Sequence, residues 1–164
     1  MSDDHAAHAI GAYGSVINKT PNLDRIANDG IRFDNCFCTN SICGPSRAVI
    51  QTGKHSHKNG FMNNGNSFDW NQQTFAKILQ KDGYETALYG KSHLKGTPQG
   101  FDDWKVLPGQ GLYYNPDFLT PDVKIDDFVY STDRDAEKDV ERITEKRHKS
   151  KPLDVMRKHK ATHR

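Results

Sequence analysis

Cys43 stands just before a predicted short helix. Pro45 suits the first position of that helix, because its missing N–H costs nothing there, and Gly53 suits the left-handed position after the helix end. We therefore predict a helix over residues 45–52, whose orphan N–H groups and positive dipole end favour an anion beside the thiol. Arg47 follows about one turn later and can point toward the same place. A sulfur nucleophile, a helix N-terminus and a cation together suit a sulfate or phosphate ester.

Two further pairs of polar residues could do chemistry. Asp3 and Asp4 are adjacent carboxylates, which suit a hard divalent cation such as calcium or magnesium, although on composition alone a solvated acidic terminus is the favoured interpretation. Lys91 and His93 lie two residues apart after a predicted strand over 84–89, so both can point to one side of an extended turn. A fixed ammonium and an imidazole that titrates near neutral pH suit an anion site. The alternative is a solvated basic loop.

The periodicity of apolar residues predicts the elements that position these groups. A helix is capped by Thr20 and ended by Gly30, a strand covers 31–38, and a second helix covers 71–82 before the strand over 84–89. The order helix, strand, helix, helix, strand predicts an α/β sheet with crossover helices.

Burial is expected at two places. Cys36 and Cys38 lie two apart on a predicted strand and face one side of it, so we expect two small buried side chains rather than a disulfide or a metal pair. Val49 and Ile50 are expected to pack on the sheet from the helix that follows Cys43.

Several segments resemble one family. The stretch C-G-P-S-R-A-V-I-Q-T-G-K, which begins at Cys43, resembles the sulfatase motif C-x-P-S-R-x4-T-G. The segment T-P-N-L-D-R-I-A-x-x-G-I-R-F before it resembles the segment that leads sulfatases into that motif. After the strand, G-K-S-H-L resembles the sulfatase G-K-W-H-L, with Ser92 in place of tryptophan. The aromatic stretch that begins at Gly100 resembles the G-F-D-x-W of polysaccharide-acting sulfatases.

The resemblance implies a fold and an organisation. The fold is α/β, a partial alkaline-phosphatase-like mixed sheet flanked by helices and incomplete at both ends. We expect residues 1–164 to be the N-terminal portion of a sulfatase catalytic domain, a fragment without the opening strand or the C-terminal part. In such domains an apolar strand runs into the Asp-Asp pair. The chain by itself is expected to lack full activity.

The resemblance also implies a mechanism. A formylglycine-generating enzyme would oxidise Cys43 to formylglycine (3-oxoalanine), whose hydrate would attack the sulfur of a sulfate ester. Arg47 and Lys91 would offset charge on the sulfuryl oxygens. His93 would take a proton as sulfate leaves, and His163 would protonate the departing alcohol.

A calcium ion would complete the site, bound by Asp3, Asp4 and the formylglycine made from Cys43. His163 is assigned through residues 151–164, which resemble a buried sulfatase strand and the histidine turn after it, although Lys158 is a poor residue for such a strand.

The implied function is a sulfuric ester hydrolase acting on a sulfated small molecule or glycan, and the aromatic stretch favours a glycan. Two alternatives stay open: a catalytically inactive remnant or binding module on the same scaffold, and a phosphate or phosphonate ester hydrolase of the same superfamily. No apolar run is long enough for a membrane helix or a signal peptide, so no membrane partner is predicted. Residues 146–164 are basic but lack interleaved aromatic residues, so no nucleic-acid partner is predicted either. The localisation is left open by the sequence.

Overall fold

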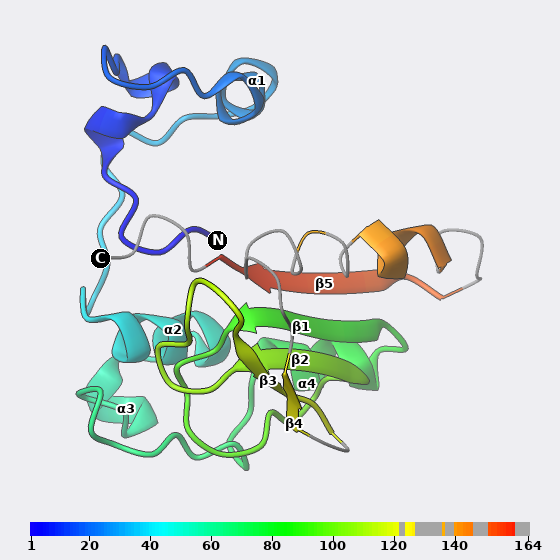
Figure 1. The fold of residues 1–164 in the computed structure, drawn as a ribbon. Helices are drawn as coiled ribbons and strands as arrows, with labels where there is room; N and C mark the ends of the chain where they lie inside the picture. The colour runs from blue at the N-terminus through cyan, green and yellow to red at the C-terminus, as the bar shows by residue number, and fades with distance from the viewer. Residues whose placement is uncertain (122–123, 127–135, 137–139, 146–150, 160–164) are drawn as a thin grey trace. The chain divides into compact units, whose positions relative to one another are not determined.

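The computed structural model describes residues 1–121, 124–126, 136, 140–145 and 151–159 (Figure 1). These residues divide into two compact units. Among the described residues, the larger contains Met1–Asp3 and those between Thr39 and His159, and the smaller contains Asp4–Cys38. No helix among the described residues is long and apolar enough to cross a membrane.

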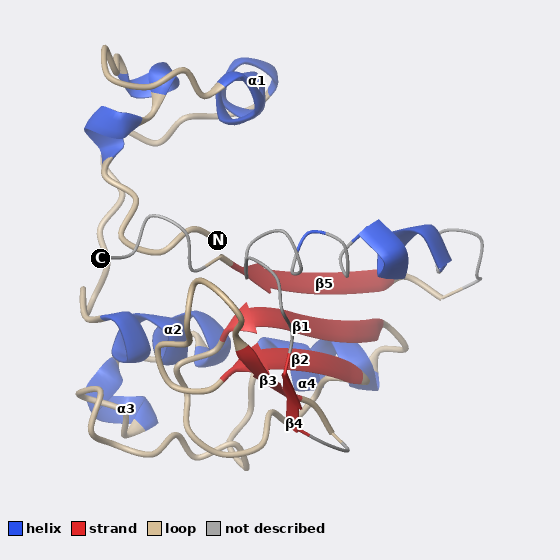
Figure 2. Cartoon of the chain, in the orientation of Figure 1, coloured by secondary structure: helices blue, strands red, loops and turns tan. Residues whose placement is uncertain are grey.

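The larger unit is built on a mixed five-stranded sheet, which confirms the predicted α/β class (Figure 2). The strand order is β4-β3-β2-β1-β5. The central strand β1 pairs in parallel with β2 and β5, whereas the β2–β3 and β3–β4 pairs are antiparallel. The strands are β1 (Glu85–Lys91), β2 (Asp103–Leu107), β3 (Asp117–Leu119), β4 (Lys124–Asp126) and β5 (Leu153–Lys158).

The helices α2 (Cys43–Thr52), α3 (Ser56–Asn59) and α4 (Phe75–Lys81) accompany this sheet, and residues 140–145 are also helical. The helix predicted over 71–82 is therefore present but starts later, because Thr74 is its N-cap and accepts a hydrogen bond from the Lys77 N–H. Figure 1 shows α2 beside the C-terminal ends of β1 and β5. In open α/β sheets, sites gather beyond those strand ends.

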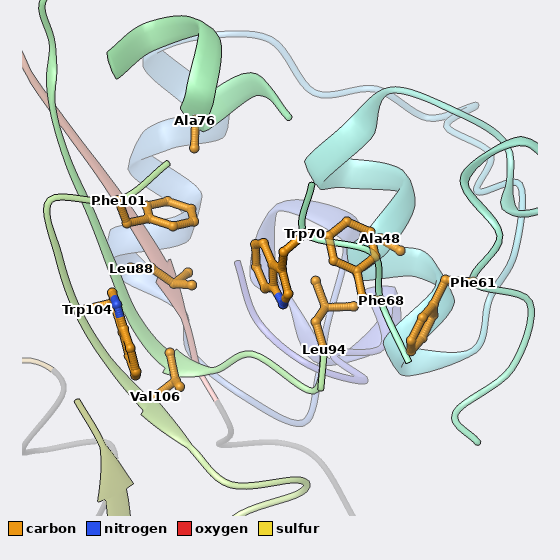
Figure 3. Close-up of a cluster of buried hydrophobic side chains, with 10 residues drawn as sticks. All are labelled: Ala48, Phe61, Phe68, Trp70, Ala76, Leu88, Leu94, Phe101, Trp104 and Val106. Atoms are coloured by element: carbon orange, nitrogen blue, oxygen red, sulfur yellow. The ribbon is translucent and has the colours of Figure 1, made fainter. Parts of the chain in front are cut away.

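The core of the larger unit is formed by side chains from the sheet, from α2 and α4, and from the connecting loops (Figure 3). Phe68 and Trp70 meet edge to face, with ring centroids 4.9 Å apart. The Trp70 indole N–H donates to the Lys95 carbonyl at 3.0 Å, so its polar atom is satisfied. The cluster comprises Ala48, Phe61, Phe68, Trp70, Ala76, Leu88, Leu94, Phe101, Trp104 and Val106.

The start of the chain is attached to the end of β5. The Met1 amino group donates to the Arg157 carbonyl, and the His159 N–H donates to the Met1 carbonyl, both at 3.0 Å. These two bonds hold Asp3 in the larger unit, next to the strand ends where α2 begins.

The smaller unit contains two 3-10 turns, Ala7–Ala9 and Gly11–Tyr13, and the helix α1 (Pro21–Asp29). The helix expected between Thr20 and Gly30 is confirmed. The strand predicted over 31–38 is wrong: those residues have no strand pairing.

Cys36 and Cys38 are exposed free thiols, so the prediction of two buried side chains is wrong as well. Phe33 and Phe37 beside them are also exposed. Among its described residues, the smaller unit contains no strand that could pair with this segment and no buried side chain on which it could pack.

Candidate active site

Helix α2 presents Cys43 at its first turn. The helix begins at Cys43 itself, two residues earlier than predicted, because the Ser46 N–H already donates to the Ile42 carbonyl at 2.8 Å. Cys43 is half-buried at the first turn of this helix. The predicted end is confirmed: Gly53 has φ 65° and its N–H bonds the Val49 carbonyl.

Gly44 allows the thiol to sit close to a neighbouring loop. A Cβ at this position would lie 2.8 Å from both Phe61 Cε1 and Asn64 Oδ1. The Gly44 N–H donates to Asn64 Oδ1 at 3.0 Å, so the loop occupies the space that a side chain would need. Glycine therefore lets the helix start and the loop approach each other.

The buried face of α2 differs from the predicted one. Ile50 is 45% exposed and Val49 half-buried, whereas Arg47 and Gln51 are 0% exposed. Residues 43, 47 and 51 recur at one-turn spacing, so the face that turns inward is the polar face that carries the cysteine. Helix α2 therefore packs on the sheet with the face of Cys43 and Arg47, and not with the more apolar face of Val49 and Ile50.

Asp3 joins the two buried cations of the site. Its Oδ1 lies 3.0 Å from Arg47 Nη2, and its Oδ2 accepts a hydrogen bond from Lys91 Nζ. Asp3 is 4% exposed, and both cationic side chains are 0% exposed. Burial raises the pKa of the Asp3 carboxyl, but the hydrogen bonds and charges of Lys91 and Arg47 outweigh burial and lower that pKa from 3.8 to about 2.

Arg47 also ties the helix to the sheet, because its Nη1 donates to the Lys91 carbonyl at the end of β1. The predicted cations therefore lie together, from elements far apart in the sequence. One carboxylate balances two buried charges, which leaves this cluster with a positive excess.

His93 also contacts the thiol. Its Nδ1 lies 3.2 Å from Cys43 Sγ, and the same sulfur lies 3.5 Å from Asp3 Oδ1. His93 has φ 52°, a left-handed conformation that is strained for a side-chain-bearing residue. Strain of this kind clusters at functional sites. Here it turns the imidazole at the strand end toward α2.

Two predicted site residues are not among the residues of the larger unit that the structure describes. Asp4 belongs to the smaller unit and has φ 51°, and His163 lies outside the described residues. The described residues contain no group of three or more His, Cys, Asp or Glu that could hold a metal ion.

Calcium takes about six to eight oxygen ligands. Both oxygens of Asp3 are engaged by Arg47 and Lys91, so a calcium ion would share them with these cations and would need further ligands from outside the described residues. The calcium site at Asp3, Asp4 and residue 43 stays a prediction.

Sequence reasoning missed Lys158 as a member of the site. It is the last residue of β5, is 0% exposed, and interacts electrostatically with both Arg47 and Cys43. The signal was its position: a lysine that ends a buried parallel strand lies at the edge where such sites gather.

Comparison with known proteins identifies the family of this chain. A model of the sulfatase family matches residues 1–152. The chain belongs to the sulfatase family. Over 167 aligned residues this sulfatase chain is 50% identical to N-acetylglucosamine-6-O-sulfatase of Bacteroides thetaiotaomicron, an alignment that covers 100% of the chain and 30% of that relative. The predicted resemblance to sulfatases, glycan-acting ones included, is confirmed. The chain spans about a third or less of the length of the curated relatives it matches.

Solved structures are similar to this chain as well. The structure of BT4656 with its substrate D-glucosamine-2-N,6-O-disulfate matches with a TM-score of 0.96 and 50% identity, over 100% of this sulfatase chain and 34% of that one. A phosphonate monoester hydrolase of Agrobacterium radiobacter matches less well, with a TM-score of 0.57 and 26% identity over 65% of this chain and 25% of that one.

Proposed function

We propose that this sulfatase chain carries the nucleophile half of a sulfuric ester hydrolase site, with formylglycine made from Cys43 by a formylglycine-generating enzyme. The observation that supports this most is the convergence on one thiol. Cys43 Sγ lies 3.2 Å from His93 Nδ1 and 3.5 Å from Asp3 Oδ1, at a helix N-terminus beside two buried cations. When present, the formylglycine hydrate supplies a hydroxyl that attacks sulfur and a second hydroxyl that allows sulfate to leave.

The side chains around residue 43 divide the remaining tasks. Arg47 and Lys91 are held in place by Asp3, so they can offset charge on ester oxygens without reorganising when the charge develops. His93 Nδ1 faces the atom at position 43 and can accept a proton there. Asp3 Oδ1 lies 3.5 Å from Cys43 Sγ and can orient a hydroxyl group at that position. His163 is proposed to protonate the leaving alcohol.

A sulfated glycan is the proposed substrate class. The support comes from the 50% identical relative, which is an N-acetylglucosamine-6-O-sulfatase, and from the similar structure that holds a sulfated glucosamine. In the aromatic stretch from Gly100, Phe101 and Trp104 are buried in the core, whereas Tyr114 is 73% exposed and its ring could stack on a sugar. Calcium is proposed as the cofactor of the longer domain, with Asp3 and Asp4 among its ligands and the other ligands outside the described residues.

A chimera tests this function. Residues 1–164 would replace the matching third of the 50% identical relative, and the chimera would be expressed with a formylglycine-generating enzyme. We expect turnover of an aryl sulfate that the Cys43→Ser chimera lacks, because a serine cannot provide the second hydroxyl. Equal turnover by the Cys43→Ser chimera would refute the mechanism.

Turnover of an aryl phosphate in preference to the sulfate would favour the alternative function, a phosphate or phosphonate ester hydrolase. The similarity to the Agrobacterium phosphonate monoester hydrolase supports testing this alternative. A folded chimera that turns over neither ester would favour the inactive remnant or binding module.

A further inference from the structure

We propose that Lys158 is a third cationic residue of the site and that its ammonium group contacts the oxyanion that binds beside Cys43. This inference rests on the proposed function and adds a residue to the same site. It is carried by the position, the burial and the missing partner of the Lys158 side chain.

The register of the sheet directs Lys158 toward helix α2. Lys158 pairs with Gly90 of β1, so β1 offers no side chain beside it at that level. Met156, two residues earlier and on the same face of β5, lies 3.2 Å through its sulfur from Gln51 Nε2. Lys158 is one step nearer the strand end, and Arg47 is one turn nearer the helix start than Gln51. The lysine therefore faces the part of α2 that leads to Cys43.

Lys158 differs from the other buried lysines of this sheet. Lys91 is paired with Asp3, and Lys105 lies with its Nζ 4.4 Å from the centroid of the Phe118 ring. The Nζ of Lys158 is fully buried and has no hydrogen-bond partner among the described residues. Lysine is almost never fully buried unless it is paired, and an unpaired buried charge is costly. A ligand that brings acceptor oxygens would satisfy it.

The charge balance at this end of the sheet favours an anion as that ligand. Arg47, Lys91 and Lys158 are three buried cations, and Asp3 is the carboxylate that pairs with the first two. Arg47 Nε is a second buried donor without an acceptor among the described residues. Two unsatisfied donors on facing elements suit two oxygens of one tetrahedral oxyanion.

The electrostatics of Lys158 are consistent with this arrangement. Burial and the charge of Arg47 lower the pKa of Lys158 to about 7, and Cys43 opposes this shift. The Lys158 ammonium group therefore interacts electrostatically with both the Arg47 guanidinium group and the Cys43 side chain. An oxyanion bound between them would stabilise its charged form.

The test measures binding of inorganic sulfate by the 164-residue chain, with Cys43 as the thiol, by equilibrium dialysis and by thermal unfolding in millimolar sulfate at constant ionic strength. Lys158→Met keeps the length of the side chain and removes its charge. Lys105→Met is the matched control, a buried lysine of the same sheet that faces an aromatic ring instead. Sulfate also stabilises proteins non-specifically, because it is excluded from their surface. This effect would raise the unfolding temperatures of all variants alike and would not saturate.

We expect saturable sulfate binding by the wild type and the Lys105→Met chain, and binding weakened at least about tenfold in the Lys158→Met chain, the effect of one lost charge-assisted hydrogen bond. Without sulfate, Lys158→Met should unfold at a higher temperature than the wild type, because an unpaired buried charge has been removed. Saturable binding that Lys158→Met leaves unchanged would overturn the proposal, as would a sulfate response that is unsaturable in all three chains.

A lower unfolding temperature for Lys158→Met together with an intact sulfate response would assign the lysine a structural role and would also overturn the proposal. The test needs neither formylglycine nor turnover. Sulfate binding through Lys158, together with a folded and matured chimera that hydrolyses no ester, would refute the proposed function alone. Hydrolysis by the chimera without such sulfate binding would refute this inference alone.

Discussion

Replacing Asp3 by asparagine should destabilise the larger unit strongly. The substitution keeps the size of the side chain but leaves Arg47 and Lys91 as buried cations without their carboxylate. Removing one partner of a buried ion pair costs about 3–5 kcal/mol. The pKa of Asp3 gives an independent value for this free energy. That pKa falls from 3.8 to about 2 on folding, which corresponds to a contribution of about 2 kcal/mol to the free energy of unfolding at neutral pH. Because domains are stable by only about 5–15 kcal/mol, either value is a large share.

The destabilisation caused by Asp3→Asn should depend on pH in a definite direction. A carboxyl whose pKa is lowered in the folded state contributes its full stability above its unfolded pKa, here 3.8, and loses that contribution as the pH falls toward 2. The difference in free energy of unfolding between the wild type and Asp3→Asn should therefore be large at pH 7 and should shrink below pH 3.8. Urea unfolding followed by tryptophan fluorescence measures it.

The control for this experiment is the exposed Arg32–Asp34 pair, whose side chains are 43% and 63% exposed. Asp34→Asn should change the free energy of unfolding by only about 0–1 kcal/mol, because solvent screens an exposed pair. An Asp3→Asn chain as stable as the wild type at pH 7, or as little affected as the Asp34→Asn chain, would refute the assignment of Asp3 as the residue that holds the two cations.

Further predictions concern the surroundings of the site. Gly44→Ala should cost about 1–3 kcal/mol, since the added Cβ would lie 2.8 Å from an aromatic carbon of the core; urea unfolding measures this, and an unchanged midpoint would contradict it. Thr74→Ala should cost about 1 kcal/mol by removing the side-chain cap of α4, which helical circular dichroism during urea unfolding would follow. In the native chain, Cys36 and Cys38 should react with a thiol reagent before the half-buried Cys43. A Cys43→Ala chain that loses a fast-reacting thiol would contradict that order.

The sequence predicted the parts of the site that local patterns encode. The helix after Cys43, its stop at Gly53, and the strand that leads to Lys91 and His93 could all be expected from turn chemistry and periodicity. The one-turn spacing from Cys43 to Arg47 was enough to expect the arginine near the thiol.

The remainder depends on long-range packing, which local patterns do not encode. Asp3 reaches the site because Met1 pairs with β5, more than 150 residues away in the chain. Ile50 is 45% exposed although it is apolar, whereas Arg47 and Ala48 of α2 are buried, and Arg47 contacts Asp3 and the Lys91 carbonyl from distant parts of the chain. Lys158 was unexpected for the same reason: its burial follows from β5 lying beside β1.

The segment over 31–38 shows the opposite error. Its apolar residues resemble a strand in composition, yet a strand needs a paired neighbour, and the smaller unit supplies none to this segment. Its exposed cysteines follow directly from that missing pairing.

The mass of the tryptic peptide over residues 33–47, isolated after expression with a formylglycine-generating enzyme, tests the central claim most directly. This peptide contains Cys36, Cys38 and Cys43, and alkylation marks every cysteine that stays a thiol. The account predicts that Cys43 alone escapes alkylation and shows the mass change from thiol to aldehyde, and that the Cys43→Ser chain shows no such change. A Cys43 that is fully alkylated, in a maturation system that converts a sulfatase relative in parallel, would contradict the claim that this cysteine becomes the nucleophile.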